Sequence, residues 1–275
     1  MRGHKDAIYD FVLDEDRKKV YSAGADGYVV EWNLSDPENG NLVLQTQDAI
    51  YSVGLAENGL RIGTQKGDVL NVDLKAKKLL STNRVHNGGI FITQSNRSGG
   101  EDGILVTSDM LTGIRVSTKS LRCLVETADY LYIGASDSMI YKLDRNTYEL
   151  LAKLEGHTNS VFGLELIDNK TLVSTGRDGT IKAWDLTIDK EVYSVPAHEY
   201  QAKSLSWNGK FLMSSSMDKT IKLWSSELSL LKVIDFERYQ GHTNCINKVK
   251  WIDEERFISC SDDRTLVLWK VEINS

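Results

Sequence analysis

The sequence predicts an all-β fold in which four-stranded antiparallel sheets repeat along the chain. A short motif returns at intervals of roughly 40–45 residues, a period typical of repeat architectures. Between its copies, short β-branched and apolar segments are separated by Gly and Asp-Gly turns such as Asp178-Gly179, and Asp-Gly is a strong hairpin signal. No segment has the 3.6-residue apolar period of a long amphipathic helix.

The repeated motif begins with Gly-His, continues with Ser-x-x-x-Asp, and ends at a Trp six residues after the Asp. Four copies have near-constant spacing, and Ala197 replaces the Gly in the third of them. These copies comprise His4, Ser22, Asp26 and Trp32; His157, Ser174, Asp178 and Trp184; His198, Ser214, Asp218 and Trp224; and His242, Ser259, Asp263 and Trp269. Such regular spacing marks repeated structural units.

The motif resembles the WD40 repeat, which builds the blades of β-propellers. The resemblance is strong over residues 1–35 and 150–275 and weak over residues 36–149. It implies one propeller domain spanning residues 1–275. It also implies that each His, Ser, Asp and Trp set is a structural tetrad, in which hydrogen bonds run from the Trp indole to Ser, then to His and to the turn Asp.

Alignment on the third-strand Trp of each repeat gives seven positions and therefore predicts seven four-stranded blades. The positions are Trp32, Val72, Ser117, Leu143, Trp184, Trp224 and Trp269. Within each blade, four strands named a to d run in order from the central channel to the rim. Repeats two to four are degenerate. In the second repeat Lys66-Gly67 replaces the Asp-Gly turn, and in the third Leu111 stands where the turn Asp is expected. In the fourth repeat Asp137 occupies the position of the turn Asp.

Two places fit this arrangement poorly. The interval from Ser117 to Leu143 is short for four strands, so strand a of the fourth blade lacks sequence. A six-bladed ring that merges repeats three and four is the alternative. At the ends, only Met1 and Arg2 precede the first Gly-His and KVEINS follows Trp269, so either KVEINS forms an outer strand or the last blade has three strands. The polar segment 95–103 is expected to be a loop.

Composition excludes several classes of function. The net charge of −6 and the absence of a basic stripe argue against a nucleic-acid partner. No apolar run reaches the length of a transmembrane helix, and no signal peptide is visible, so we expect a cytoplasmic protein without a membrane partner. The three cysteines lack CxxC spacing, and one His per blade cannot converge on a metal. We therefore expect neither a metal nor a cofactor.

The resemblance places the functional surface on the narrow top face around the channel. Three positions of each blade point there: those three and five residues after the His, and the one before the turn Asp. These positions include Tyr9, Tyr51, Phe91, Phe162, Arg177, Lys203, Met217, Asn247 and Asp262. Aromatic, Met and Arg residues are enriched in protein interfaces, so we predict a partner-binding surface. The alternative is that the aromatic residues pack between blades.

The leading functional hypothesis is a non-catalytic scaffold or adaptor, a monomeric propeller within a complex. Its partner would be a protein or peptide whose acidic side chains meet Arg177 and Lys203. The alternative is an enzyme-complex subunit or a small-ligand-binding propeller that uses the channel mouth, with Asp262 and Cys245 as its candidates. A catalytic triad is rejected, because the Ser, His and Asp combination occurs four times and each Ser would be buried.

Overall fold

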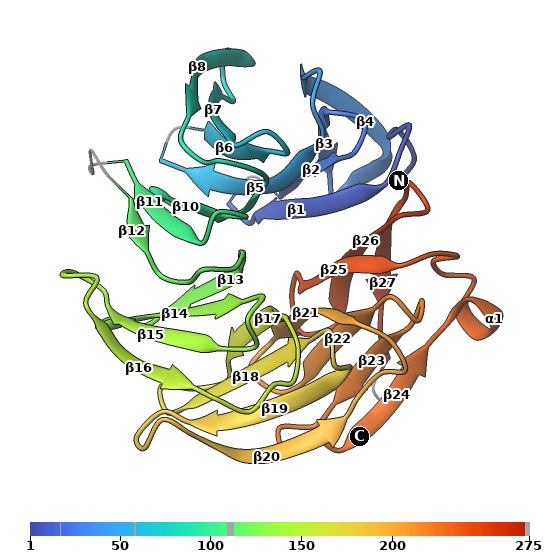
Figure 1. The fold of residues 1–275 in the computed structure, drawn as a ribbon. Coiled ribbons are helices and arrows are strands. Elements are labelled where there is room, and N and C mark those ends of the chain that lie inside the picture. The colour runs from blue at the N-terminus through green and yellow to red at the C-terminus, as the bar shows by residue number, and fades with distance from the viewer. Residues whose placement is uncertain (17, 58, 109–112, 273–275) are drawn as a thin grey trace.

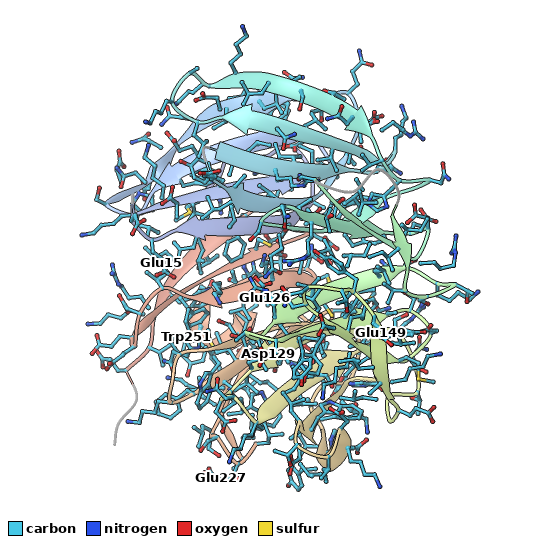
Figure 2. All side chains as sticks on the ribbon, turned by 90° about the vertical axis from the view of Figure 1, so that its left-hand side faces the viewer. Glu15, Glu126, Asp129, Glu149, Glu227 and Trp251 are labelled. Atoms are coloured by element: carbon cyan, nitrogen blue, oxygen red, sulfur yellow. The ribbon has the colours of Figure 1, made fainter. Side chains whose placement is uncertain are left out.

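The computed structural model describes residues 1–16, 18–57, 59–108 and 113–272. Its strands form seven antiparallel sheets, arranged as blades around a central channel (Figure 1). The seven-bladed propeller predicted from the sequence is confirmed, and the six-bladed alternative is wrong. Figure 2 shows the ring from the side, where exposed charged residues such as Glu149 and Glu227 project from its surface.

The first three blades each follow the order a to d along the chain. Blade one contains β1 (Ile8–Asp14), β2 (Lys19–Gly24), β3 (Tyr28–Asn33) and β4 (Asp36–Gln45). Blade two contains β5 (Ile50–Ala56), β6 (Gly59–Thr64), β7 (Asp68–Asp73) and β8 (Lys78–Arg84). Blade three contains β9 (Ile90–Gln94), β10 (Arg97–Gly100), β11 (Ile104–Thr107) and β12 (Ile114–Arg115).

The remaining blades repeat this order. Blade four contains β13 (Leu121–Glu126), β14 (Tyr130–Ala135), β15 (Ile140–Asp144) and β16 (Leu150–Leu154). Blade five contains β17 (Val161–Leu166), β18 (Thr171–Gly176), β19 (Thr180–Asp185) and β20 (Lys190–Pro196). Blade six contains β21 (Ala202–Trp207), β22 (Leu212–Ser216), β23 (Ile221–Trp224) and β24 (Leu230–Ile234). Helix α1 (Phe236–Tyr239) leads into blade seven, which contains β25 (Ile246–Trp251), β26 (Arg256–Ser261) and β27 (Leu266–Lys270).

Blade three corrects the sequence alignment. The polar segment expected to be a loop contains strand β10, whose four residues are all buried. Glycine suits this position because the backbone packs closely: a Cβ on Gly100 would lie 2.4 Å from the carbonyl oxygen of Gly89. Strand c is β11, so the assignment of Ser117 to strand c of this blade was wrong. Leu111, expected at the turn, lies outside the described residues.

Blade four has all four of its strands. Because strand c of blade three ends at Thr107, enough chain remains before Leu143 for β13 to form strand a. The predicted shortage of sequence was therefore an error of register in the preceding repeat. Ser117 lies in the link between the two blades, at the position that His occupies in other repeats.

In blade seven the first residues of the chain meet its last strand. Three strands form its sheet, and Arg2 makes an antiparallel bridge to Thr265 at the outer edge of β27. The amino terminus of Met1 donates to the carbonyl of Leu266 at 3.1 Å, and the N–H of Leu266 donates back to Met1 at 3.3 Å. Of the two arrangements left open by the sequence, the described residues adopt the three-stranded blade.

The core lies between adjacent blades. Strands alternate their side chains between two faces, and each apolar face packs against that of the neighbouring blade. Between the first and last blades, Ile8, Phe11 and Val20 pack with Ile258 and Leu266. Full burial of each such side chain contributes about 1.5–3 kcal/mol to folding. This packing holds the inner strands in a ring. Among the described residues, no helix is long and apolar enough to cross a membrane.

Candidate partner-binding surface at the channel mouth

Hydrogen-bonded rows fix the loops that surround the channel mouth. In blade five, the indole N–H of Trp184 donates to the Ser174 hydroxyl at 2.7 Å. That hydroxyl lies 2.6 Å from Nε2 of His157, whose Nδ1 lies 2.8 Å from Asp178. Since a carboxylate only accepts, Nδ1 of the neutral imidazole carries the proton and Nε2 accepts from Ser174. Ser174 is fully buried and cannot reach a substrate.

The other predicted tetrads have the same arrangement. Their hydrogen bonds join His4, Ser22, Asp26 and Trp32; His198, Ser214, Asp218 and Trp224; and His242, Ser259, Asp263 and Trp269. In each row, the Asp also accepts from the backbone N–H of the residue after the His, so it ties the loop before strand a to the turn after strand b. Because this hydrogen bond recurs in each blade that has a tetrad, it fixes the positions of the loops at the channel mouth.

The sequence analysis missed a further row in blade three. His86 lies 3.0 Å from both Asp102 and Ser98. Ser108 occupies the position of the Trp, ten residues after Ser98, by analogy with Ser174 and Trp184. The spacing Ser98-x-x-x-Asp102 was a visible signal, but it was hidden within a Gly-rich segment that was expected to be a loop.

The buried aspartates couple the fold to pH. Burial alone raises the pKa of Asp178, but the hydrogen bonds from His157, from the N–H of Thr158 and from Thr180 outweigh burial and hold that pKa well below its usual range. The pKa values of Asp218 and Asp263 are lowered in the same way. A carboxyl whose pKa is lower in the folded state stabilises the fold above its unfolded pKa of about 4, and this contribution is lost as pH falls.

We therefore expect the melting temperature to fall as pH decreases below about 5, as these carboxylates take up protons. Calorimetry between neutral and acidic pH measures the slope. The variant Asp178→Asn has one fewer titrating group and should have a shallower slope than the wild type. Equal slopes for the two proteins would contradict a contribution from Asp178.

A row of aromatic and cationic side chains follows strands a around the channel. Tyr9 meets Tyr51 edge-on at 5.4 Å between ring centroids, and Tyr51 stacks on Phe91 at 5.4 Å. The next residue in this row is the guanidinium of Arg122, 4.1 Å from the centroid of Phe91 and 5.7 Å from that of Phe162. On the other side of Phe162, the ammonium of Lys203 lies 5.0 Å from its ring centroid.

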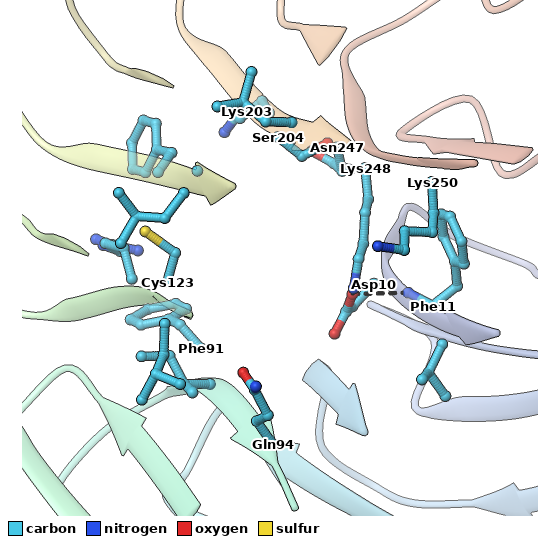
Figure 3. Close-up of a pocket in the computed structure, with 18 of the residues that line it drawn as sticks. Asp10, Phe11, Phe91, Gln94, Cys123, Lys203, Ser204, Asn247, Lys248 and Lys250 are labelled. Carbon is cyan, nitrogen blue, oxygen red and sulfur yellow. Dashed lines mark hydrogen bonds and ion pairs between the residues drawn. The ribbon is translucent and has the colours of Figure 1, made fainter. Parts of the chain in front are cut away.

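These side chains line one cavity of about 710 Å³ with Asn247 of blade seven. Figure 3 shows Lys203 and Asn247 along the upper edge of the cavity and Phe91 at its lower left. The six predicted strand-a residues are thus brought together: Tyr9, Tyr51, Phe91, Phe162, Lys203 and Asn247. They are half-buried, so part of each side chain remains accessible from the channel. Tyr9, Tyr51 and Phe91 also contact one another across three neighbouring blades, as the alternative of packing between blades expected.

Arg122 is a lining residue that the sequence did not predict, because the fourth blade had been left without a strand a. Its Nε donates to the Ser136 hydroxyl at 2.8 Å, and burial lowers its pKa. Within the described part of the chain, neither Arg122 nor Lys203 forms an ion pair. Deeper in the channel the cations are paired, since Lys248 lies 2.6 Å from Asp10 and Lys250 lies 4.0 Å from Glu165. The unpaired positive charge is therefore concentrated beside Phe162.

The predicted turn residues differ in their surroundings. Asp262 accepts a hydrogen bond of 2.7 Å from the side-chain amide of Asn247, so these two side chains are hydrogen-bonded to each other. Arg177 is exposed and close enough to Arg122 to lower its pKa by charge repulsion, a smaller effect than burial. Met217 is 46% exposed. These three residues are not part of the cavity lining.

Comparison with known proteins agrees with this architecture. The family model described as "WD domain, G-beta repeat" matches residues 1–33, 148–185, 189–225 and 235–270, just over half of the chain. The chain is 22% identical to "Ribosome biogenesis protein YTM1" of Lodderomyces elongisporus over 81% of this chain and 50% of that protein. It is 32% identical to "Ribosome biogenesis protein WDR12 homolog" of Culex quinquefasciatus over 49% of this chain and 32% of that protein.

A third relative, the "66 kDa stress protein" of Physarum polycephalum, is 23% identical over 99% of this chain and 47% of its own length. The chain thus spans at most about half the length of these relatives. All four segments matched by the family model contain one of the complete tetrads, whereas the degenerate blades lie between the matches.

Proposed function

The chain belongs to the WD40 family, and we propose that it is a non-catalytic scaffold that binds a protein or peptide at the channel mouth. The observation that carries this proposal is the row of accessible aromatic side chains with Arg122 and Lys203 unpaired beside it. Aromatic and Arg side chains are the usual anchors of protein interfaces. A rigid ring supports them, so little entropy is lost when a partner is bound.

The partner that best suits this surface has an acidic side chain. Arg122 and Lys203 flank the ring of Phe162 on two sides. A carboxylate placed between them would make charge-assisted hydrogen bonds, while an apolar neighbour in the partner covers Phe162. Half-burial of Arg122 strengthens such a contact, because the charge is partly withdrawn from water.

An enzymatic role is less well supported. Burial raises the pKa of the Cys245 thiol to about 11, so little nucleophilic thiolate exists at neutral pH. The other candidate, Asp262, is engaged by Asn247. The cavity has the size of a small-molecule pocket, about 300–1,000 Å³, which makes small-ligand binding the second candidate function.

We expect Cys245 to resist alkylation by iodoacetamide at pH 8 in the native protein and to react readily after unfolding, because the thiolate is the reactive form. Peptide mass spectrometry after timed labelling measures both rates. Rapid native labelling of Cys245 would contradict the raised pKa and would restore this thiol as a candidate nucleophile.

The relatives limit what is carried over to this chain. Two of them are named for ribosome biogenesis, but identities of 22% and 32% over partial lengths support only the coarser role of a scaffold within a complex. We propose that the propeller itself is monomeric and that its place is the cytoplasm, which suits three free thiols. Fluorescence microscopy of a tagged protein tests the location, and a nuclear or exported signal would contradict it.

Affinity capture from a lysate of the source cells tests the proposed function. The baits are the wild type and a Tyr51→Ala, Phe162→Ala, Arg177→Glu variant with an unchanged melting temperature. A Tyr193→Ala variant, altered on the outer strand β20, is the matched control. We expect the wild type and control to retain a protein that the triple variant loses. Equal capture by all three would place the site elsewhere, and capture by none would favour the small-ligand candidate.

A further inference from the structure

A second cavity, of about 550 Å³, lies between blades two and three. Its lining includes Ala56 and Glu57 after β5, Ser95 and Asn96 after β9, and Arg61 of β6. These lining turns join strand a to strand b, whereas the loops of the channel mouth precede strand a or follow strand b. The cavity is therefore at the opposite end of the blades from the channel mouth.

The cavity occurs where the repeat lacks two large side chains. In blades four and five, Tyr132 of strand b and Trp184 of strand c belong to one apolar cluster. In blades two and three, Arg61 has the place of Tyr132 in the strand register, and Ser108 has the place of the Trp. Nη1 of Arg61 donates to the Ser108 hydroxyl at 2.8 Å, so these two side chains meet between the blades. Because serine is much smaller than tryptophan, space remains open beside them.

Arg61 is a buried cation that has no counter-ion among the described residues. It is only 8% exposed, and burial lowers its pKa. Its hydrogen bond goes to a neutral hydroxyl, and its Nε has no acceptor. Glu57 lines the same cavity, but it is exposed and forms no ion pair with Arg61. A buried charge without a partner destabilises a fold, so this guanidinium favours an anionic ligand.

The next interface, between blades three and four, contains the carboxylate that Arg61 lacks. Arg97 corresponds to Arg61, because each pairs with the fifth residue of strand a in its own blade. Nη1 of Arg97 donates to Glu126, the sixth residue of strand a in blade four, at 3.0 Å. In blade three, the residue in the place of Glu126 is Ser95, which lines the cavity with Arg61. Nε lacks an acceptor in both arginines, so the carboxylate is the difference between the two interfaces.

We propose that the cavity between blades two and three binds a carboxylate, which pairs with Arg61 as Glu126 pairs with Arg97. The aliphatic part of the acid packs against Leu55 and Ala56, which also line the cavity. The planar guanidinium of arginine matches the geometry of a carboxylate. Two sources present this same group: a glutamate side chain of a partner protein and a small organic acid. The site is separate from the channel mouth and goes beyond the function proposed there.

A phosphate group suits the cavity less well than a carboxylate. Among the described residues that line it, Arg61 is the one cation, and Glu57 carries a negative charge. A single guanidinium balances one negative charge, whereas a phosphate monoester carries close to two at neutral pH. The neutral side chains of Asn71, Ser95 and Ser108 add no further positive charge.

The experiment follows the Nε–H signal of Arg61 by NMR in protein labelled with nitrogen-15 arginine, and an Arg61→Met variant assigns the signal. The probes are the peptide acetyl-Ala-Glu-Ala-amide, its twin with Gln in place of Glu, and sodium butyrate with sodium chloride as the salt control. We expect the Glu peptide to bind at least about tenfold more tightly than the Gln peptide. A response to the Glu peptide alone identifies a protein side chain as the ligand, and an equal or stronger response to butyrate identifies a small acid.

A Ser95→Glu variant supplies the carboxylate from the chain itself, as Glu126 does in the next blade. We expect this variant to melt at a higher temperature than Ser95→Gln, its matched control, and to lose the response that Ser95→Gln retains. An Arg122→Glu variant should respond as the wild type does, which separates this site from the channel mouth. The proposal would be overturned by no response of the wild type to either acid, by equal responses to the Glu and Gln peptides, or by equal responses of the two Ser95 variants.

Discussion

Replacement of Ser174 by alanine is expected to lower the free energy of unfolding more than the same change at Ser98. Ser174 bonds both Trp184 and His157, so its loss leaves two buried polar groups without a partner. Ser98 bonds His86 in a blade that has no Trp, so its loss leaves one. Each unsatisfied buried group costs about 1–3 kcal/mol.

Chemical denaturation of the two variants and the wild type measures the difference. Ser174 and Ser98 are both fully buried, and both substitutions remove one hydroxyl, so the cavity created is closely matched. We expect a loss of about 2–6 kcal/mol for Ser174→Ala and about half as much for Ser98→Ala. Equal losses would indicate that the indole hydrogen bond contributes nothing, and the structural role of the tetrad would need revision.

Charge reversal at Arg122 is expected to weaken partner binding about 100-fold. A hydrogen bond to a charged group contributes about 1.5–3 kcal/mol, and the introduced carboxylate would also repel an acidic ligand. Each 1.4 kcal/mol corresponds to about tenfold in affinity. The effect should exceed that of Arg177→Glu, because Arg122 lines the cavity and contacts two aromatic rings.

Binding isotherms of the captured partner with Arg122→Glu test this expectation. Lys190→Glu, an exposed site at the start of β20, is the control for the same change in net charge. Arg122→Lys keeps the charge but loses the planar contact with Phe91, so we expect an intermediate affinity. If Arg122→Glu and Lys190→Glu bind equally well, the partner does not use this guanidinium.

The sequence predicted the fold because its strongest repeats carry both the turn chemistry and the buried polar residues. In the repeats that lack the Trp, the alignment of the sequence to the four strands of the blade was ambiguous. Ser98 and Asp102 keep their spacing, yet Gly99 and Gly100 gave a buried strand the appearance of a loop. These two positions require glycine because neighbouring segments pack closely against them. Such contacts between distant segments cannot be predicted from the local sequence.

That error of register also explains what was missed at the channel mouth. The rule of five residues after the His located Tyr9, Phe91, Phe162, Lys203 and Asn247, and Tyr51 was found at the equivalent position of the second repeat, five residues after Thr46. Blade four has Ser117 instead of the His, so the same rule had no starting point, although five residues after Ser117 lies Arg122. The pairing of Lys248 with Asp10 depends on the closure of the ring between its first and last blades.

Amide hydrogen exchange of the complex tests whether a partner binds at the channel mouth. We expect slower exchange in the loops that lead into the inner strands, near Tyr9, Tyr51, Phe91, Phe162 and Lys203, with unchanged exchange in the outer strands β8, β16 and β20. Protection confined to the outer strands or to the opposite end of the channel would contradict it.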